Sequence, residues 1–186
     1  IPDMRSRRMR GPRTFLQARG GATAVEFALV APMLLLTIAF VMAVALVMFV
    51  NQRLDYATSQ AARQVMIGKA KINGIDQATF KTALCSRLPA VMSCGNVVVN
   101  LYKVQPTFGA KSGYYAFVKP DVSGLLVPSQ TSGSGQYDLG NAGDYQYLQV
   151  IYPISVLPSV FASMLGTDGS TSYLAISTAA FRNEKF

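Results

Sequence analysis

The stretch that decides the fold reads Gly20-Gly21-Ala22-Thr23-Ala24-Val25-Glu26-Phe27 at residues 20–27. It opens an apolar run that continues to Val50, interrupted only by Thr23, Glu26, Pro32 and Thr37. A helix of this length reaches about 43 Å at about 1.5 Å per residue, which is enough to cross a bilayer with some tilt. The run therefore predicts a transmembrane helix over residues 22–50 that carries one carboxylate, Glu26.

The segment before this run, residues 1–21, predicts the orientation of the helix. It contains six arginines against a single acid, Asp3, and it shows no helical stripe. Because the cytoplasmic flanks of membrane helices carry an excess of Arg and Lys, we expect a basic cytoplasmic leader. Everything after Val50 is then expected on the opposite side of the membrane.

The net charge of +8 divides unevenly along the chain. The leader contributes +5 from six Arg and one Asp, and the other 165 residues contribute only +3. A nucleic-acid-binding domain would gather its basic residues on one face with aromatic residues between them, whereas the basic residues beyond the leader are spread thinly. The basicity indicates membrane topology, and no nucleic-acid partner is expected.

The chain contains no His and only two cysteines, Cys85 and Cys94. Zinc sites with Cys and His ligands, Ser-His-Asp triads and Cys-His dyads are therefore excluded, and the acids beyond the membrane run show no paired spacing. We expect no enzyme activity, no metal and no cofactor. In an oxidising compartment the two cysteines are expected to form a disulfide, with two free buried thiols as the alternative.

Helical spacing continues past the apolar run. Apolar residues recur three or four apart at Val50, Leu54, Ala57, Ala61 and Val65, until Gly68 offers a helix stop. This pattern predicts an amphipathic continuation of the membrane helix over residues 51–72, with one stripe available to a sheet. The remaining residues, 73–186, are expected to form one extracytoplasmic domain, since they suffice for a single core.

Within that domain the sequence predicts short elements. Asp76 is a good N-cap for a helix that Pro89 helps to end, and it places Cys85 on that helix. Residues 97–104, 145–152 and 173–181 have strand character, residues 114–118 a weaker one, and residues 156–165 suggest a brief helix. Residues 128–144 have the composition of a flexible loop. The expected fold class is α+β: a long N-terminal transmembrane and amphipathic helix packed on a small antiparallel sheet.

Glu26 allows two interpretations. A charge at the centre of a lipid-embedded helix costs about 2.5 to 3.5 kcal/mol, so intramembrane carboxylates usually have a partner. Alternatively, Glu26 lies only five residues into the span and reaches water near the cytoplasmic headgroups. Three neighbouring features favour a partner: the glycines upstream, the spacing of five residues from Gly21, and the aromatic Phe27 directly after the acid.

These residues resemble a known processing motif. Gly21, four residues and then Glu26-Phe27 look like the prepilin processing site of type IV pilins, in the form used by tight-adherence (Tad/Flp, type IVb) pili. The stretch from Arg19 to Pro32, residues 54–63 and the terminal residues 180–184 are similar to TadE-like proteins, which are pilin-like accessory subunits of the Tad pilus machinery. The middle of the chain carries hardly any resemblance.

The resemblance implies a function and a set of sites. A prepilin peptidase would cleave between Gly21 and Ala22, with cleavage after Gly20 left open. Glu26 and Phe27 would then dock the subunit, because Glu26 can pair with the new amine of Ala22 on a neighbouring pilin or pseudopilin. The implied location is the bacterial inner membrane, with a periplasmic C-terminal domain, and the pilus itself is a second location that the resemblance implies.

One departure separates the chain from major Tad pilins, which resemble little more than the processed helix. A domain of this size on every subunit is hard to fit into a thin filament, so the sequence favours a low-copy pseudopilin. The alternative from a different class is an uncleaved signal-anchored protein whose extracytoplasmic domain binds a ligand or an envelope partner.

Overall fold

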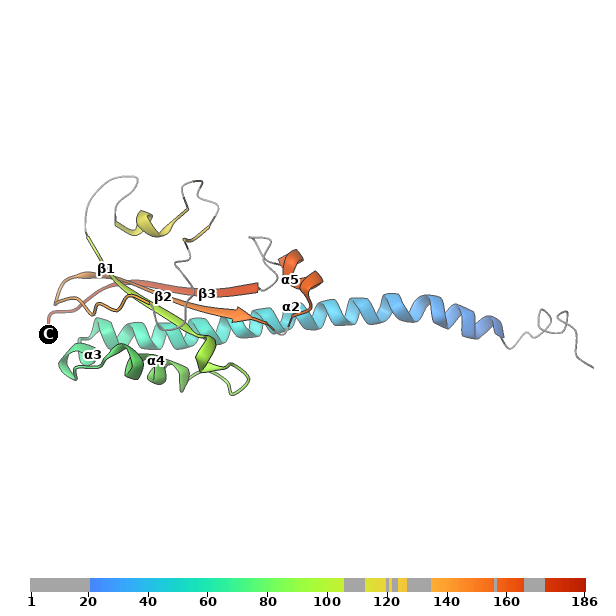
Figure 1. The fold of residues 1–186 in the computed structure, drawn as a ribbon, viewed down its shortest axis with the longest axis horizontal. Helices are drawn as coiled ribbons and strands as arrows, with labels where there is room; N and C mark the ends of the chain where they lie inside the picture. The colour runs from blue at the N-terminus through green and yellow to red at the C-terminus, as the bar shows by residue number, and fades with distance from the viewer. Residues whose placement is uncertain are drawn as a thin grey trace, which may run out of the picture. The chain divides into compact units, whose positions relative to one another are not determined.

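The computed structural model describes residues 21–105, 113–119, 121, 124–126, 135–155, 157–165 and 173–186. The chain divides into two compact units, Ile1–Met42 and Ala43–Phe186. Figure 1 shows the helices and strands of both units. The described part of the first unit is helical almost throughout, and the second unit holds the sheet.

Helix α2 comprises Ala22–Met66 and includes Pro32 without interruption. In the second unit its residues from Ala43 onward present one buried stripe, which contains Val50, Leu54, Ala57, Ala61 and Val65 together with Ala43 and Val47. The spacing of three and four residues puts these side chains on one face of the helix. Helix α2 therefore carries a buried stripe beyond the apolar run and ends at Met66, within the range of residues 51–72 that the sequence suggested for an amphipathic continuation.

The end of α2 is fixed by a left-handed residue and by the C-terminal segment. Gly68 has φ +72° and its N–H donates to the Val65 carbonyl at 2.9 Å, after which the short helix α3 spans Lys69–Ile72. The N–H of Glu184 donates to the Met66 carbonyl at 2.8 Å. The ring of Phe186 lies where a Cβ on Gly68 would be. A glycine is therefore required here both by backbone conformation and by close packing.

Helix α4, Gln77–Cys85, is capped and cross-linked. The Asp76 carboxylate accepts from the Thr79 N–H at 3.2 Å, and hydrogen bonds from the Thr79 side chain and backbone lower the pKa of Asp76. Cys85 forms a disulfide with Cys94, with 5.7 Å between the two Cα atoms. Cys94 opens the 3-10 turn η2, Cys94–Asn96, so the bridge joins the end of α4 to the residues that lead into the sheet.

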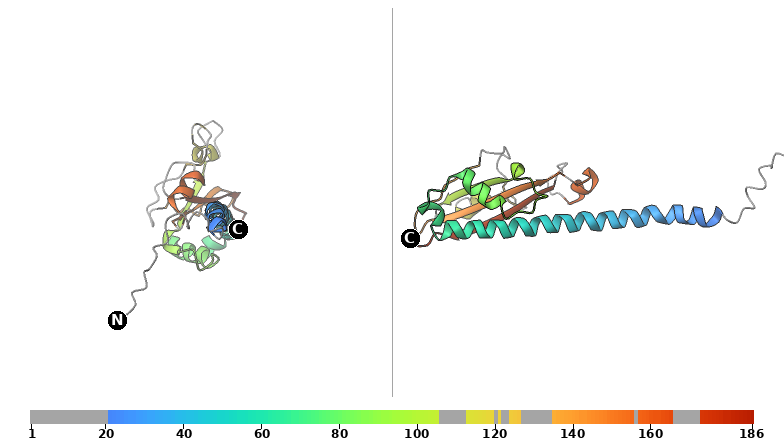
Figure 2. Two further views of the ribbon diagram at one scale, coloured as in Figure 1. Left: turned by 90° about the vertical axis from the view of Figure 1, so that its right-hand side faces the viewer. Right: turned by 90° about the horizontal axis from the view of Figure 1, so that it is seen from below.

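The sheet has three antiparallel strands in the order β1-β2-β3: Val98–Val104, Tyr145–Ile154 and Tyr173–Arg182. Leu101 pairs with Leu148, and Ile151 pairs with Ile176. Val99, Leu101 and Val150 share one buried cluster with Leu54 of α2 and Phe80 of α4. Figures 1 and 2 show both helices along the same face of the sheet. The predicted α+β class with a small antiparallel sheet is thus confirmed.

The prediction of a weak strand at residues 114–118 is wrong. This segment is the 3-10 helix η3, Gly113–Phe117, and only an isolated bridge joins Val118 to Leu125. In a strand, Tyr114 and Phe117 would point to opposite faces, whereas residues three apart in a 3-10 helix lie on one side. Both rings can therefore reach Tyr147 on the second face of the sheet, at centroid distances of 6.4 and 4.2 Å.

Residues 135–144, the described part of the loop predicted for residues 128–144, contain no helix or strand, but they pack on the domain, which their composition did not suggest; residues 128–134 lie outside the described residues. Leu101 of β1 receives a hydrogen bond from the Asp138 N–H at 3.1 Å and donates to the Gln136 carbonyl at 2.7 Å. The Tyr137 hydroxyl donates to the Ile75 carbonyl at 2.9 Å, and its ring lies 5.5 Å from Phe80. Burial raises the pKa of Tyr137 to about 12. One aromatic ring and backbone pairing anchor a segment that is otherwise polar.

Gly68→Ala is expected to destabilise the fold by more than Gly74→Ala. Both glycines have positive φ, +72° and +59°, but a Cβ at Gly74 has nothing within 4 Å, whereas one at Gly68 would overlap Phe186. The backbone strain alone costs about 1 kcal/mol in each variant, and the overlap adds to it at Gly68 only. Thermal unfolding of the two full-length variants in detergent measures the difference. Equal losses of stability in the two variants would contradict this expectation, because they would show that the Phe186 ring moves aside without a further cost.

Candidate subunit-docking site and the domain surface

The candidate docking site lies at the first turns of α2. Gly21 is an exposed residue of a 3-10 turn, a Cβ at this position would have nothing within 4 Å, and the helix begins at Ala22. The side chain of Glu26 is exposed, and Phe27 is 74% exposed. The residues that the sequence nominated for cleavage and docking thus share one open helix start.

Glu26 has no hydrogen-bond or ion-pair partner among the residues that the structure describes. Thr37, another polar residue of the apolar run, differs in this respect, because its hydroxyl donates to the Leu34 carbonyl of its own helix at 2.7 Å. A serine or threonine satisfied in this way is tolerated in lipid, whereas an unpaired carboxylate is not. Glu26 therefore requires a partner from outside its own helix, whereas Thr37 does not.

The apolar surface around this site is large. From Thr23 to Met42 every side chain is exposed except Ala31, which is half-buried. One helix of the described part of the chain, Thr23–Met66, is long and apolar enough to cross a membrane, by length and composition. An exposed apolar stretch of this extent is compatible with a single-pass membrane anchor.

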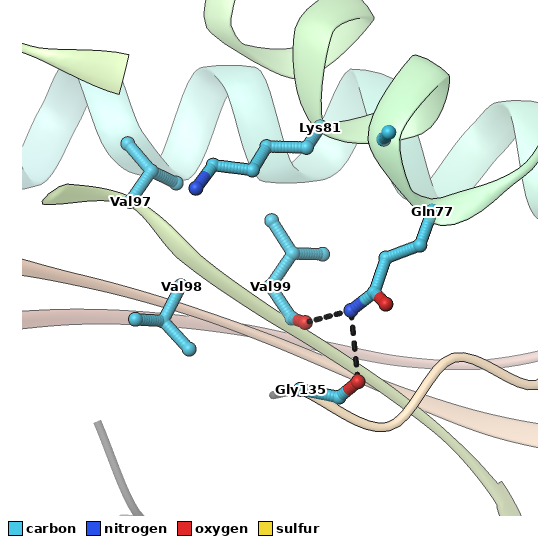
Figure 3. Close-up of a pocket in the computed structure, with 7 residues that line it drawn as sticks. Gln77, Lys81, Val97, Val98, Val99 and Gly135 are labelled. Carbon is cyan, nitrogen blue, oxygen red and sulfur yellow. Dashed lines mark hydrogen bonds between the residues drawn. The ribbon is translucent and has the colours of Figure 1, made fainter. Parts of the chain in front are cut away.

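The domain surface offers a small cavity of about 190 Å³ beside the start of β1. Figure 3 shows Gln77 and Lys81 of α4 pointing toward the backbone of residues 97–99. The Gln77 amide donates to the carbonyls of Gly135, at 2.8 Å, and Val99, at 3.4 Å. A Cβ at Gly135 would overlap the Val99 carbonyl, so glycine permits this close approach of two backbones. The polar groups of the cavity are thus largely used in joining α4, β1 and the segment that begins at Gly135.

An ion pair joins β1 to the turn before β2. Lys103 Nζ lies 2.7 Å from the Asp144 carboxylate, which also accepts from the Asn141 N–H at 2.7 Å. The hydrogen bond from Lys103 lowers the pKa of Asp144 and raises that of Lys103 itself. Lys71 of α3 donates to the Gly140 carbonyl and the Asn141 side chain in the same turn. These contacts fix a turn, and the group contains no nucleophile or base poised for catalysis.

No group of three or more His, Cys, Asp or Glu side chains gathers as a metal site among the described residues. The site residues that the sequence nominated fall into two places: the helix start with Gly21, Ala22, Glu26 and Phe27, and the disulfide of Cys85 with Cys94. The cavity at Gln77 and Gly135 was missed. Its only sequence signal was a glycine in a stretch with the composition of a loop.

These features define a class of protein: an α+β domain carried on one long helix whose exposed apolar start bears a lone carboxylate. Residues 21–63 match the family model described as TadE-like protein. This segment of the chain is thus TadE-like, which confirms the resemblance inferred from the sequence, and the family implies a protein associated with the Tad pilus. It is a structural family rather than a known enzyme family. No curated protein and no solved structure matches the chain.

The extent of the match coincides with one element. It begins at Gly21 and ends at Arg63, so it covers α2 almost entirely and no part of the sheet. The terminal residues 180–184, which also resembled the family, lie outside it. The shared feature is therefore the helix with its N-terminal motif.

Asp144→Asn is expected to lower the thermal midpoint most near neutral pH. Because the folded-state pKa of Asp144 is depressed, its contribution is complete above its ordinary value of 3.8 and is lost as the pH falls through the folded-state pKa. The raised pKa of Lys103 keeps the pair intact up to its ordinary value of 10.5. Midpoints of the native chain and the variant, measured from pH 2 to 9, should converge at the acid end. A difference that stays constant with pH would contradict this pairing.

Proposed function

We propose that the protein is a TadE-like minor pseudopilin of a Tad/Flp (type IVb) pilus. It inserts in the bacterial inner membrane with its basic leader in the cytoplasm and its domain in the periplasm. A prepilin peptidase removes the leader, and the mature helix then packs with other pilin or pseudopilin helices, at the start of assembly or within the pilus. The observation that carries this proposal is Glu26, a carboxylate without a partner among the described residues, at the helix start where the TadE-like match begins.

Cleavage creates a cationic group that can pair with Glu26. Hydrolysis of the Gly21–Ala22 peptide bond consumes one water and leaves a carboxylate on Gly21 and an α-ammonium on Ala22. The bond lies at the first residue of α2, where Gly21 is exposed and has no side chain to obstruct a protease. A helix that begins at its own new N-terminus then presents the ammonium within one and a half turns of Glu26.

Docking follows from electrostatics in a medium of low dielectric constant. An ammonium and a carboxylate attract each other strongly where water is excluded, and either one left unpaired is penalised. Glu26 of one subunit pairs with the Ala22 ammonium of its neighbour, which fixes the axial register of two otherwise featureless apolar helices. The exposed ring of Phe27 packs beside the pair and keeps water away from it.

The size of the domain favours a low number of copies of this subunit in each pilus. The second unit, residues 43–186, holds a folded α+β body rather than a short extension. A body of this size on each subunit would crowd a thin filament. A subunit that initiates assembly or occupies one end of the filament avoids this crowding.

Cleavage after Gly21 predicts a mature chain that begins at Ala22. Co-expression with a prepilin peptidase, followed by mass spectrometry of the membrane-extracted protein, should show Ala22 as the first residue. Gly21→Val should block processing, whereas Gly20→Val, the matched control one residue upstream, should still be cut. The peptidase is tested in parallel on a known prepilin. If it cleaves that prepilin but leaves this leader attached, the result would contradict the proposal and favour a signal-anchored binding protein.

Glu26→Gln should leave membrane insertion unchanged and impair assembly. The variant keeps the size of the side chain but removes its charge, and breaking a buried ion pair costs about 3 kcal/mol or more, roughly a hundredfold in association. Co-purification with the other pilus subunits, and the number of pili per cell, measure the loss. Glu26→Asp should retain part of the function. Thr37→Ala should be neutral, because that hydroxyl is satisfied within its own helix.

A further inference from the structure

Helix α5, Ser159–Leu165, lies at one end of the sheet in the second unit. It follows the end of β2 at Ile154 and precedes the start of β3 at Tyr173. The Asn51 side chain of α2 donates to the Tyr173 hydroxyl at 3.3 Å, which fixes this end of the sheet beside residues near 51 of α2. Figures 1 and 2 show α5 at this end of the sheet, alongside α2. The helix is therefore at the level where the apolar run ends.

One side of α5 is anchored and the other is open. Leu157, just before the helix, is buried, and Phe161 packs against the core. Val160 and Met164, four residues apart on one face, are 66% and 71% exposed. No residue from Leu157 to Leu165 is charged, so this surface offers neither attraction nor repulsion to a charged partner.

The adjoining part of α2 is also exposed and apolar on the side away from the core. Ala43, Val47 and Val50 are buried within the second unit, whereas Met48 and Phe49 are 61% and 38% exposed. The apolar surface stops just beyond, where the Arg53 guanidinium lies 5.3 Å above the Phe49 ring. A cationic side chain at the end of an apolar helix is typical of a membrane–water interface, which long Arg and Lys side chains reach from near the helix end.

The length of the helix leaves room for an interfacial layer. The hydrocarbon core of a bilayer needs about 20 helical residues, and residues 22–42 supply 21, or about 31 Å. Residues 43–50 are then the first turns beyond the hydrocarbon core, level with the headgroups. The end of the sheet that carries α5 is tied to α2 at Asn51, directly after these turns.

We propose that α5 is an interfacial membrane helix, whose Val160 and Met164 side chains enter the boundary between lipid headgroups and acyl chains of the same bilayer that α2 spans. This inference rests on the proposed membrane span. A lipid surface is favoured over a second protein because α2 itself brings the bilayer to this level, and because the open face of α5 is apolar and uncharged. The contact holds the sheet next to the membrane until the helix is withdrawn into an assembly.

The absence of tryptophan from the chain provides a direct test. Single variants Val160→Trp and Met164→Trp, in the full chain reconstituted in nanodiscs at one copy per disc, report on their surroundings with no signal from another tryptophan of the chain. Ile72→Trp is the matched control, because Ile72 is 71% exposed and lies in α3, beyond the far end of α2. Leu35→Trp, within the proposed span, is the positive control.

Phosphatidylcholine brominated near the headgroup should quench Val160→Trp and Met164→Trp at least twofold more than Ile72→Trp. Quenching equal to that of Ile72→Trp, with Leu35→Trp quenched by lipid brominated deep in the acyl chains, would overturn the inference and leave the span intact. An unquenched Leu35→Trp would refute the span and with it the proposed function. A blue-shifted emission that appears only with two copies per disc would assign α5 to a protein contact and overturn the lipid assignment.

Discussion

The buried stripe of α2 is the constraint on which the second unit depends. Leu54, Ala57 and Val65 of this stripe belong to the same buried cluster as Leu101 and Leu148 of the sheet. The same helix continues back into an exposed apolar stretch that includes Met33, Leu36 and Val41. The C-terminal half of this continuous helix faces a protein core along one stripe. Its N-terminal part is apolar around the full circumference, a surface suited to lipid or to other helices.

The domain is closed around the end of this helix by contacts from distant parts of the chain. The C-terminal segment reaches Met66 and Gly68, the disulfide fixes the end of α4, and Lys71 and Lys103 both bind the turn at residues 140–144. These contacts join backbone to backbone or satisfy charges at a turn. Glu26, at the helix start, has no such partner among the described residues, and the proposed function, assembly rather than catalysis, rests on this carboxylate.

Much of the fold could be predicted because periodicity reports burial directly. The stripe from Val50 to Val65, the N-cap at Asp76 and the three long strands were all visible in the sequence, since each depends on local spacing or on β-branched composition. Residues 114–118 were misjudged because their aromatic content is typical of strands, whereas contact with Tyr147 favours a 3-10 turn. The packing of residues 135–144 was missed because composition does not reveal that one ring, Tyr137, anchors a polar segment.

The sequence by itself determined the apolar run, its lone carboxylate, its glycine-marked start and its basic flank, because lipid compatibility is a property of composition along one helix. It also determined the antiparallel α+β class. Only the tertiary structure decided at which residue the apolar run becomes buried in the domain. Ala43, Val47 and Val50 are buried there, although nothing in their composition distinguishes them from the exposed residues before them. Apolar side chains serve a bilayer and a protein core equally well, so the boundary between the two depends on what folds back against the helix.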